Sequence, residues 1–172
     1  MSLKSRTRGF TLLEVLIALL IFSIGLLGMA GLLILSVKAN HSAYLRTQAT
    51  FLAQSMADRM RANMPRVWHD DYSTTYPASA TDPCASGAAC SRQDMATRDI
   101  ALWSTQLTDL LPNSSAEIAC EPTAGVVISE EAQDNGAPYA GLCTLSITWS
   151  EASLNRGASG ADAQSFVWVF QP

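Results

Sequence analysis

The first apolar stretch of the chain is long enough to form a membrane-spanning helix. Between residues 10 and 37 nearly every side chain is apolar, and the only formal charge is Glu14. A helix of this length covers about 42 Å, which exceeds the roughly 30 Å hydrocarbon core of a bilayer. An ordinary secretory signal has a shorter apolar stretch and a small-x-small cleavage site, and this run has neither. An uncleaved signal anchor is the simplest alternative.

Beyond the apolar run the pattern becomes that of an amphipathic helix. Residues 38–64 contain no proline or glycine, and their apolar side chains recur at spacings of seven and four. Pro65 ends this pattern, because proline lacks an amide donor and has a fixed φ. We therefore predict one long helix over residues 10–64. Its apolar stripe contains Leu45, Leu52, Met56 and Met60, and we expect Phe51, Met56 and Met60 to form the surface on which a sheet packs.

Residues 65–172 predict a globular domain with a short helix and a β-sheet. Residues 68–89 are loop-like. Ser91 and Asp94 resemble a capping box, and apolar residues follow at helical spacing up to Pro112. Runs of β-forming residues predict four strands, at 117–121, 126–129, 142–150 and 164–171. The expected fold class is α+β, a long N-terminal helix packed on a C-terminal antiparallel β-sheet domain.

The last two predicted strands differ in their surroundings. Residues 142–150 alternate apolar and polar side chains, which indicates one face on a core and one face in water. Residues 166–170 are apolar on both faces. We expect this final strand to be covered on both sides or to meet a neighbour.

Charge indicates the orientation of the chain in the membrane. Lys4, Arg6 and Arg8 precede the apolar run with no acidic residue among them, so the N-terminus should stay in the cytoplasm and the chain from Lys38 onward should cross an inner membrane. Residues 65–172 carry thirteen acidic and four basic side chains. A domain this acidic is a poor candidate for binding nucleic acid.

The cysteines all lie beyond the apolar run, and their even number suggests disulfides in an oxidising compartment. No C-x-x-C occurs, and neither histidine falls into a ligand pattern with them, so we expect no metal and no other cofactor. Three pairings are possible. Sequence order and the inward position of Cys143 favour Cys84 with Cys90 and Cys120 with Cys143.

Nothing in the sequence predicts an enzyme. There is no nucleophile motif and no glycine-rich phosphate loop. His69-Asp70-Asp71 and Glu130-Glu131 are better explained as solvated surface than as metal or acid–base sites.

The most specific signal is the string Arg8-Gly9-Phe10-Thr11-Leu12-Leu13-Glu14, in which a Gly-Phe junction follows a basic leader and a lone glutamate follows within the apolar run. It resembles a type IV prepilin. The resemblance implies a leader of residues 1–9, cleavage between Gly9 and Phe10 by a prepilin peptidase, and methylation of the new amino terminus at Phe10. It also implies a type IV pilin-like fold.

Glu14 has a physical reason to seek a partner, because a carboxylate within a lipid-spanning helix costs several kcal/mol unless it pairs or faces protein. In a filament it could neutralise the Phe10 amine of the next subunit, which would make Glu14 the assembly contact. Alternatively, it only favours the positive end of the helix dipole while reaching the headgroups. Gly25, Gly28 and Gly31 are consistent either with close helix packing or with the ordinary glycine content of membrane helices.

Residues 23–32 and 49–63 resemble the PilV group of minor pilins. This resemblance implies a low-abundance subunit of a priming complex at the pilus tip, which supports assembly, adhesion and twitching motility. The implied partners are the prepilin peptidase, other minor and major pilins, the inner-membrane assembly platform, a tip adhesin and, before assembly, membrane lipid. The alternatives are a minor pseudopilin of a type II secretion system and a signal-anchored periplasmic binding protein that never polymerises.

Overall fold

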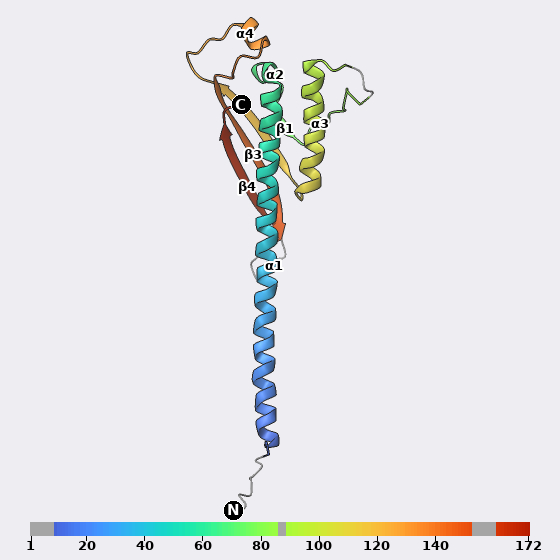
Figure 1. The fold of residues 1–172 in the computed structure, drawn as a ribbon, viewed down its shortest axis with the longest axis vertical. Helices are drawn as coiled ribbons and strands as arrows, with labels where there is room; N and C mark the ends of the chain where they lie inside the picture. The colour runs from blue at the N-terminus through green and yellow to red at the C-terminus, as the bar shows by residue number, and fades with distance from the viewer. Residues whose placement is uncertain (1–8, 86–88, 153–160) are drawn as a thin grey trace, which may run out of the picture. The chain divides into compact units, whose positions relative to one another are not determined.

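The computed structural model describes residues 9–85, 89–152 and 161–172 (Figure 1). The predicted leader lies outside these residues except for Gly9. The chain divides into two units, Met1–His41 and Ser42–Pro172. The longest helix, α1 at Leu12–Ala62, contributes to both of them.

In the N-terminal unit, α1 has no core of its own. Every large apolar side chain from Phe10 to Val37 is exposed, with Phe10 at 83% and Leu27 at 73% of full exposure. Among the described residues α1 is the one helix long and apolar enough to cross a membrane. Because so much apolar surface is stable only outside water, this part of the helix needs lipid or other protein around it.

The second unit is organised around the remaining part of α1. The predicted stripe of Leu45, Leu52, Met56 and Met60 is buried, so that expectation is confirmed. The expectation for Phe51 was wrong, since its side chain is 58% exposed. One residue corresponds to about 100° of rotation around a helix, so Phe51 points away from the face that Leu52 buries.

The long helix ends close to the predicted position, but another helix follows it at once. After α1 ends at Ala62, the chain forms the short helix α2, Met64–Trp68, with Pro65 in its first turn. Proline is tolerated there because the first amides of a helix have no intrahelical partner. Pro65 therefore lies just beyond the end of α1 and within the first turn of α2.

The predicted second helix is α3, Arg92–Leu110. Its capping box is present in full: the Ser91 side chain accepts from the Asp94 amide, and the Asp94 side chain accepts from the Ser91 amide. Trp103 and Leu107 are buried against α1, and the Trp103 indole donates to the Leu52 carbonyl at 2.9 Å. The buried side chains of the two helices thus belong to one core.

The sheet completes that core with four antiparallel strands in the order β1-β2-β3-β4. They are Thr75–Tyr76, Ser115–Pro122, Gly141–Ala152 and Ala161–Phe170. The alternation predicted for β3 is confirmed, because its inward-facing side chains are at most 2% exposed. These are Cys143, Leu145, Ile147 and Trp149.

Two short segments differ from the sequence prediction. Strand β1 lies within the segment expected to be loop, and residues 126–129 form a loop where a strand was expected. No strand forms at residues 126–129 because the backbone turns just before this segment and a helix begins directly after it. Gly125 has a φ of +81°, and Ser129 caps the short helix α4, Glu130–Asp134, by accepting from the Ala132 amide.

The cysteines pair as the sequence favoured. Cys84 is joined to Cys90, and Cys120 is joined to Cys143. Cys120 and Cys143 lie opposite one another in the β2–β3 register, so this disulfide connects neighbouring strands.

We expect the two disulfides to contribute unequally to stability. Replacing Cys120 and Cys143 together by alanine opens a loop with a sequence separation of 23 residues and should lower the free energy of unfolding by about 3 kcal/mol, against about 2 kcal/mol for the shorter Cys84–Cys90 loop. Denaturant unfolding of the full chain in detergent, followed by tryptophan fluorescence, measures both. A larger loss for the Cys84/Cys90 double variant would contradict this ranking.

Candidate functional site

The predicted processing junction lies just before the first turn of α1. Gly9, Phe10 and Thr11 are non-helical and exposed. A Cβ atom added at Gly9 would meet no other part of the described chain within 4 Å. The junction is thus free of contacts that would hide it from an enzyme, and the fold itself does not require glycine at this position.

Glu14 lies in the first turn of α1, as its alternative helix-dipole role requires, and the structure adds an N-cap at Thr11 that the sequence analysis did not name. The Thr11 hydroxyl accepts a hydrogen bond from the Glu14 amide at 3.3 Å, and the Thr11 carbonyl accepts from the Glu14 and Val15 amides. Thr11 is therefore the N-cap, and Glu14 stands at the third helical position, where a carboxylate is favoured by the helix dipole. The spacing Thr-x-x-Glu was the available signal.

The side chain of Glu14 also borders a shallow hollow on the helix surface. The hollow has a volume of about 510 Å³ and is otherwise lined by apolar side chains, because Ala18 is small and leaves room between its larger neighbours. The lining residues are Phe10, Glu14, Val15, Ala18, Leu19 and Phe22. This arrangement offers one carboxylate within an apolar surface, which suits a cationic group carried on an apolar partner.

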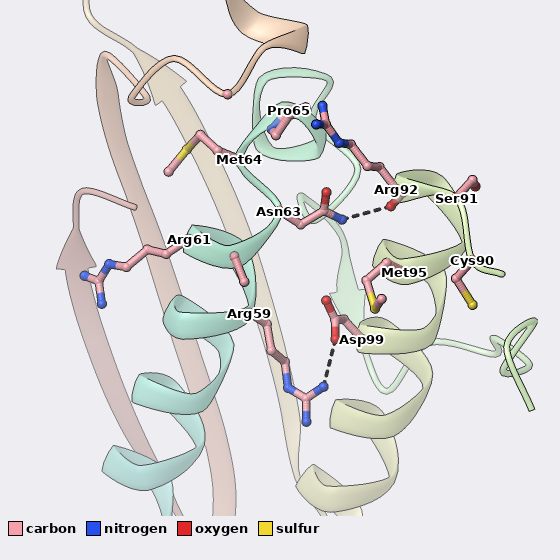
Figure 2. A pocket seen from close by; sticks show the side chains of 12 residues that line it. Arg59, Arg61, Asn63, Met64, Pro65, Cys90, Ser91, Arg92, Met95 and Asp99 are labelled. Atoms are coloured by element: carbon pink, nitrogen blue, oxygen red, sulfur yellow. Dashed lines mark hydrogen bonds and ion pairs between the residues drawn. The ribbon is translucent and has the colours of Figure 1, made fainter. Parts of the chain in front are cut away.

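A second hollow, of about 530 Å³, lies in the other unit where α1 ends and α3 begins (Figure 2). Beside it, the Arg59 guanidinium donates to Asp99 Oδ1 at 2.8 Å, and the Tyr72 hydroxyl donates to Asp99 Oδ2 at 2.9 Å. Asn63 then donates to the Tyr72 hydroxyl and to the Arg92 carbonyl. One network therefore connects α1, the segment after it and α3.

The Tyr72 phenol is a hydrogen-bond donor in this network. Burial and the nearby Asp99 charge raise the pKa of the Tyr72 phenol well above its usual value. The phenol therefore stays protonated and donates to Asp99. Because Asp99 is already paired with Arg59 and Tyr72, the arrangement provides a structural connection between two helices and offers no evident base or nucleophile.

The polar clusters noted in the sequence form local contacts. His69 lies 2.9 Å from Asp134, and Asp71 accepts from Arg66, which raises the pKa of the arginine. Asp70 is exposed with a φ of 63°. Within the described ranges no group of three or more histidine, cysteine or acidic side chains is placed to hold a metal ion.

Comparison with known families bears on both units. Residues 4–30 match the prokaryotic N-terminal methylation motif. Residues 31–101 match the family described as Type IV pilin Tt1218. Over residues 4–101 the chain is therefore similar first to a prepilin methylation motif and then to a type IV pilin domain. No curated protein and no solved structure matches it.

The two matches give the observed features of this chain a common explanation. An exposed apolar helix fits a membrane anchor, and the methylation motif implies processing by prepilin peptidase and assembly with other pilins. Pilins are structural rather than enzymatic proteins, in keeping with a polar network that holds helices together. The fold, a long helix packed on an antiparallel sheet, is α+β as predicted.

The Arg59–Asp99 pair should matter for the stability of the unit Ser42–Pro172. Asp99→Ala leaves a largely buried guanidinium and the Tyr72 hydroxyl without their acceptor, so we expect unfolding to become easier by about 3 kcal/mol. Asp58→Ala is the matched control, because Asp58 pairs with Arg61 at 3.1 Å on the exposed side of the same helix; this change should cost less than about 1 kcal/mol. Thermal unfolding in detergent compares the two variants. Similar losses in the free energy of unfolding would show that the buried network stabilises the fold no more than an exposed ion pair does.

Proposed function

We propose that this chain is a minor pilin of the PilV group, which joins other minor pilins in a priming complex at the tip of a type IV pilus. In this role it supports pilus assembly, adhesion and twitching motility. The resemblance of residues 23–32 and 49–63 to that group supports the assignment. The position of the last cysteine, Cys143, argues against a major pilin. Major pilins usually bracket their C-terminal region with a cysteine pair, whereas here Cys143 is bonded to Cys120.

The observation that carries an assembly role is the lone carboxylate on an uncovered apolar helix. Glu14 is the only formal charge in residues 10–37, and it borders a hollow that is otherwise apolar. Cleavage after Gly9 would create an amine at Phe10. Pairing of that amine with Glu14 of the adjacent subunit neutralises both charges in an environment of low dielectric constant and sets the offset between subunits.

Before assembly the chain is held in the inner membrane by α1, with its N-terminus in the cytoplasm and Ser42–Pro172 in the periplasm. The assembly platform then transfers it into the filament, where its partners are other minor and major pilins and a tip adhesin. Gly25, Gly28 and Gly31 would allow close helix packing there, because the absence of a Cβ lets a neighbouring helix approach the backbone.

The second candidate is a minor pseudopilin of a type II secretion system, which shares the leader, Glu14 and the fold class. Purification of the chain from its own host separates the two, because a PilV-group subunit should accompany sheared pili and a pseudopilin should accompany the secretion machinery. Mass spectrometry of the same sample should find methylated Phe10 at the N-terminus. An intact leader would instead support a signal-anchored protein that does not polymerise.

Gly9→Val should block processing. The peptidase must approach the backbone closely on both sides of the cut, and only glycine leaves that approach open. The full-length precursor should then accumulate in the inner membrane. Gly25→Val is the control, because it adds the same side chain at another uncrowded glycine and should be cleaved normally. Mature-length Gly9→Val protein would contradict the assigned junction.

Glu14→Ala should separate insertion from assembly. Removal of the carboxylate makes the span more apolar, so insertion and cleavage should continue. Docking should fail, because truncating one member of a buried pair costs about 3 to 5 kcal/mol, equivalent to a loss of two or more orders of magnitude in incorporation. The ratio of subunit in sheared pili to subunit in the membrane measures this.

Thr11→Ala controls for the capping role of this helix end. It removes the hydroxyl that accepts from the Glu14 amide but leaves the carboxylate, so it should cost only about 1 kcal/mol of helix stability and reduce incorporation far less. Normal incorporation of Glu14→Ala, or equal defects in both variants, would show that Glu14 is not the assembly contact.

A further inference from the structure

Strand β4 lies at the margin of the sheet (Figure 1). It pairs along its full length with β3, from Ala161 opposite Ala152 to Phe170 opposite Cys143. No strand among the described residues pairs with its other side. Within the described chain, this ten-residue edge is thus of the kind to which a strand of another chain can pair.

Apolar side chains accompany this open edge on both faces of the sheet. Val167 and Val169, on the face away from α1, are 60% and 53% exposed. On the inner face Phe166 and Trp168 are only partly buried, and the Trp168 ring stacks on Phe170 with 4.7 Å between centroids. By contrast the inward-facing side chains of β3 are fully buried. The core of this unit thus covers β3 completely and β4 incompletely.

Natural sheets usually protect such an edge with lysine, proline, a bulge or a very short strand. The opposite edge follows this rule, because β1 has two residues. Strand β4 has neither lysine nor proline, and its only charged residue is Asp162 near its beginning. An edge that is long, apolar and unprotected is suited to accept another strand. The backbone of the added strand forms hydrogen bonds with the edge, and its side chains lie beside the apolar residues on both faces of the sheet.

Two arginines of α1 contact this edge strand or the residue that follows it. Arg46 donates to Gln164 Oε1 at 3.1 Å, and Arg61 donates to the Gln171 carbonyl at 3.3 Å. Arg61 also pairs with Asp58, whereas no ion pair to Arg46 occurs in the described part of the chain. A segment seated along β4 would therefore meet positive charge, most strongly beside Gln164.

We propose that β4 accepts, as a fifth strand of the sheet, an extended segment of a different filament subunit that carries apolar side chains at alternate positions and a carboxylate facing Arg46. This inference rests on the proposed function, which supplies the neighbouring subunit. A second copy of the chain is disfavoured. Antiparallel pairing of β4 with the same strand of another copy would bring Arg46 toward the second copy's Arg61.

A photo-cross-linking experiment on the full chain in its own host tests the proposal. Benzophenone-alanine replaces Val167 in one strain and Thr144 in another, and the cross-linked peptides from sheared filaments are identified by mass spectrometry. Thr144 is the matched control because it is exposed and lies opposite Val169 on the central strand β3, away from the edge. We expect the Val167 probe to link to a strand-forming segment of another subunit, several-fold more than the Thr144 probe does.

The outcomes are distinct. Cross-links to a second copy of the chain, equal yields at the two positions, or no cross-link from a subunit present in filaments would overturn the fifth-strand proposal while leaving the proposed function intact. Absence of the chain from filaments would overturn both.

The charge requirement is tested in the strain that carries the probe at Val167. Arg46→Glu should lower the cross-link yield by up to about five-fold, the equivalent of an exposed ion pair. Arg46→Lys keeps the charge and should leave the yield nearly unchanged. Because Arg46 is exposed, neither change disturbs the core. An unchanged yield with glutamate would show that the bound segment is not recognised by a carboxylate.

Discussion

Burial of one stripe of α1 is the interaction on which the whole second unit depends. Leu45, Leu52, Met56 and Met60 fill the core, and small residues alternate with them at Ala49, Ala53 and Ala57, all fully buried. The alanines let the helix approach its neighbours closely, and a larger side chain at any of them would force the layers apart. Helix α3 and the sheet each cover part of this stripe, so neither would have a core without α1.

The same helix meets two different demands along its length. Its second part buries an apolar stripe against the rest of the chain, whereas the apolar side chains of its first part are exposed. The division also separates two kinds of polar group. Asp99 is neutralised by Arg59 inside the fold, but Glu14 has no cationic partner among the described residues. The stripe from Leu45 to Met60 is thus buried within the chain, whereas the apolar surface from Phe10 to Val37 is buried only by association or by lipid.

The periodic parts of the fold could be predicted because each has a strong local signal. Spacings of four and seven specified the stripe of α1, Ser91 and Asp94 specified the start of α3, and alternation specified β3. Strand β1 could not be found in this way, since two residues become a strand only through pairing with Ala116 and Glu117. The loop at 126–129 was mistaken for a strand because its composition favours β-structure, while its flanking turns depend on the backbone at Gly125 and Ser129. The Arg59–Asp99 pair joins residues 40 positions apart, and no pattern within either helix specifies that partner.

The disulfide between β2 and β3 also determines how the chain responds to mechanical tension. If the chain is pulled from its two ends, force passes from Cys120 to Cys143 through the covalent bond, and the segment between them is bypassed. With a sequence separation of 23, that segment would otherwise add roughly 75 Å of extension on unravelling. The C-terminal strand β4 lies beyond the bond and is held by backbone pairing and side-chain packing alone. Under load the covalent bond would therefore keep β2 and β3 connected, while β4 could separate from the sheet without breaking it.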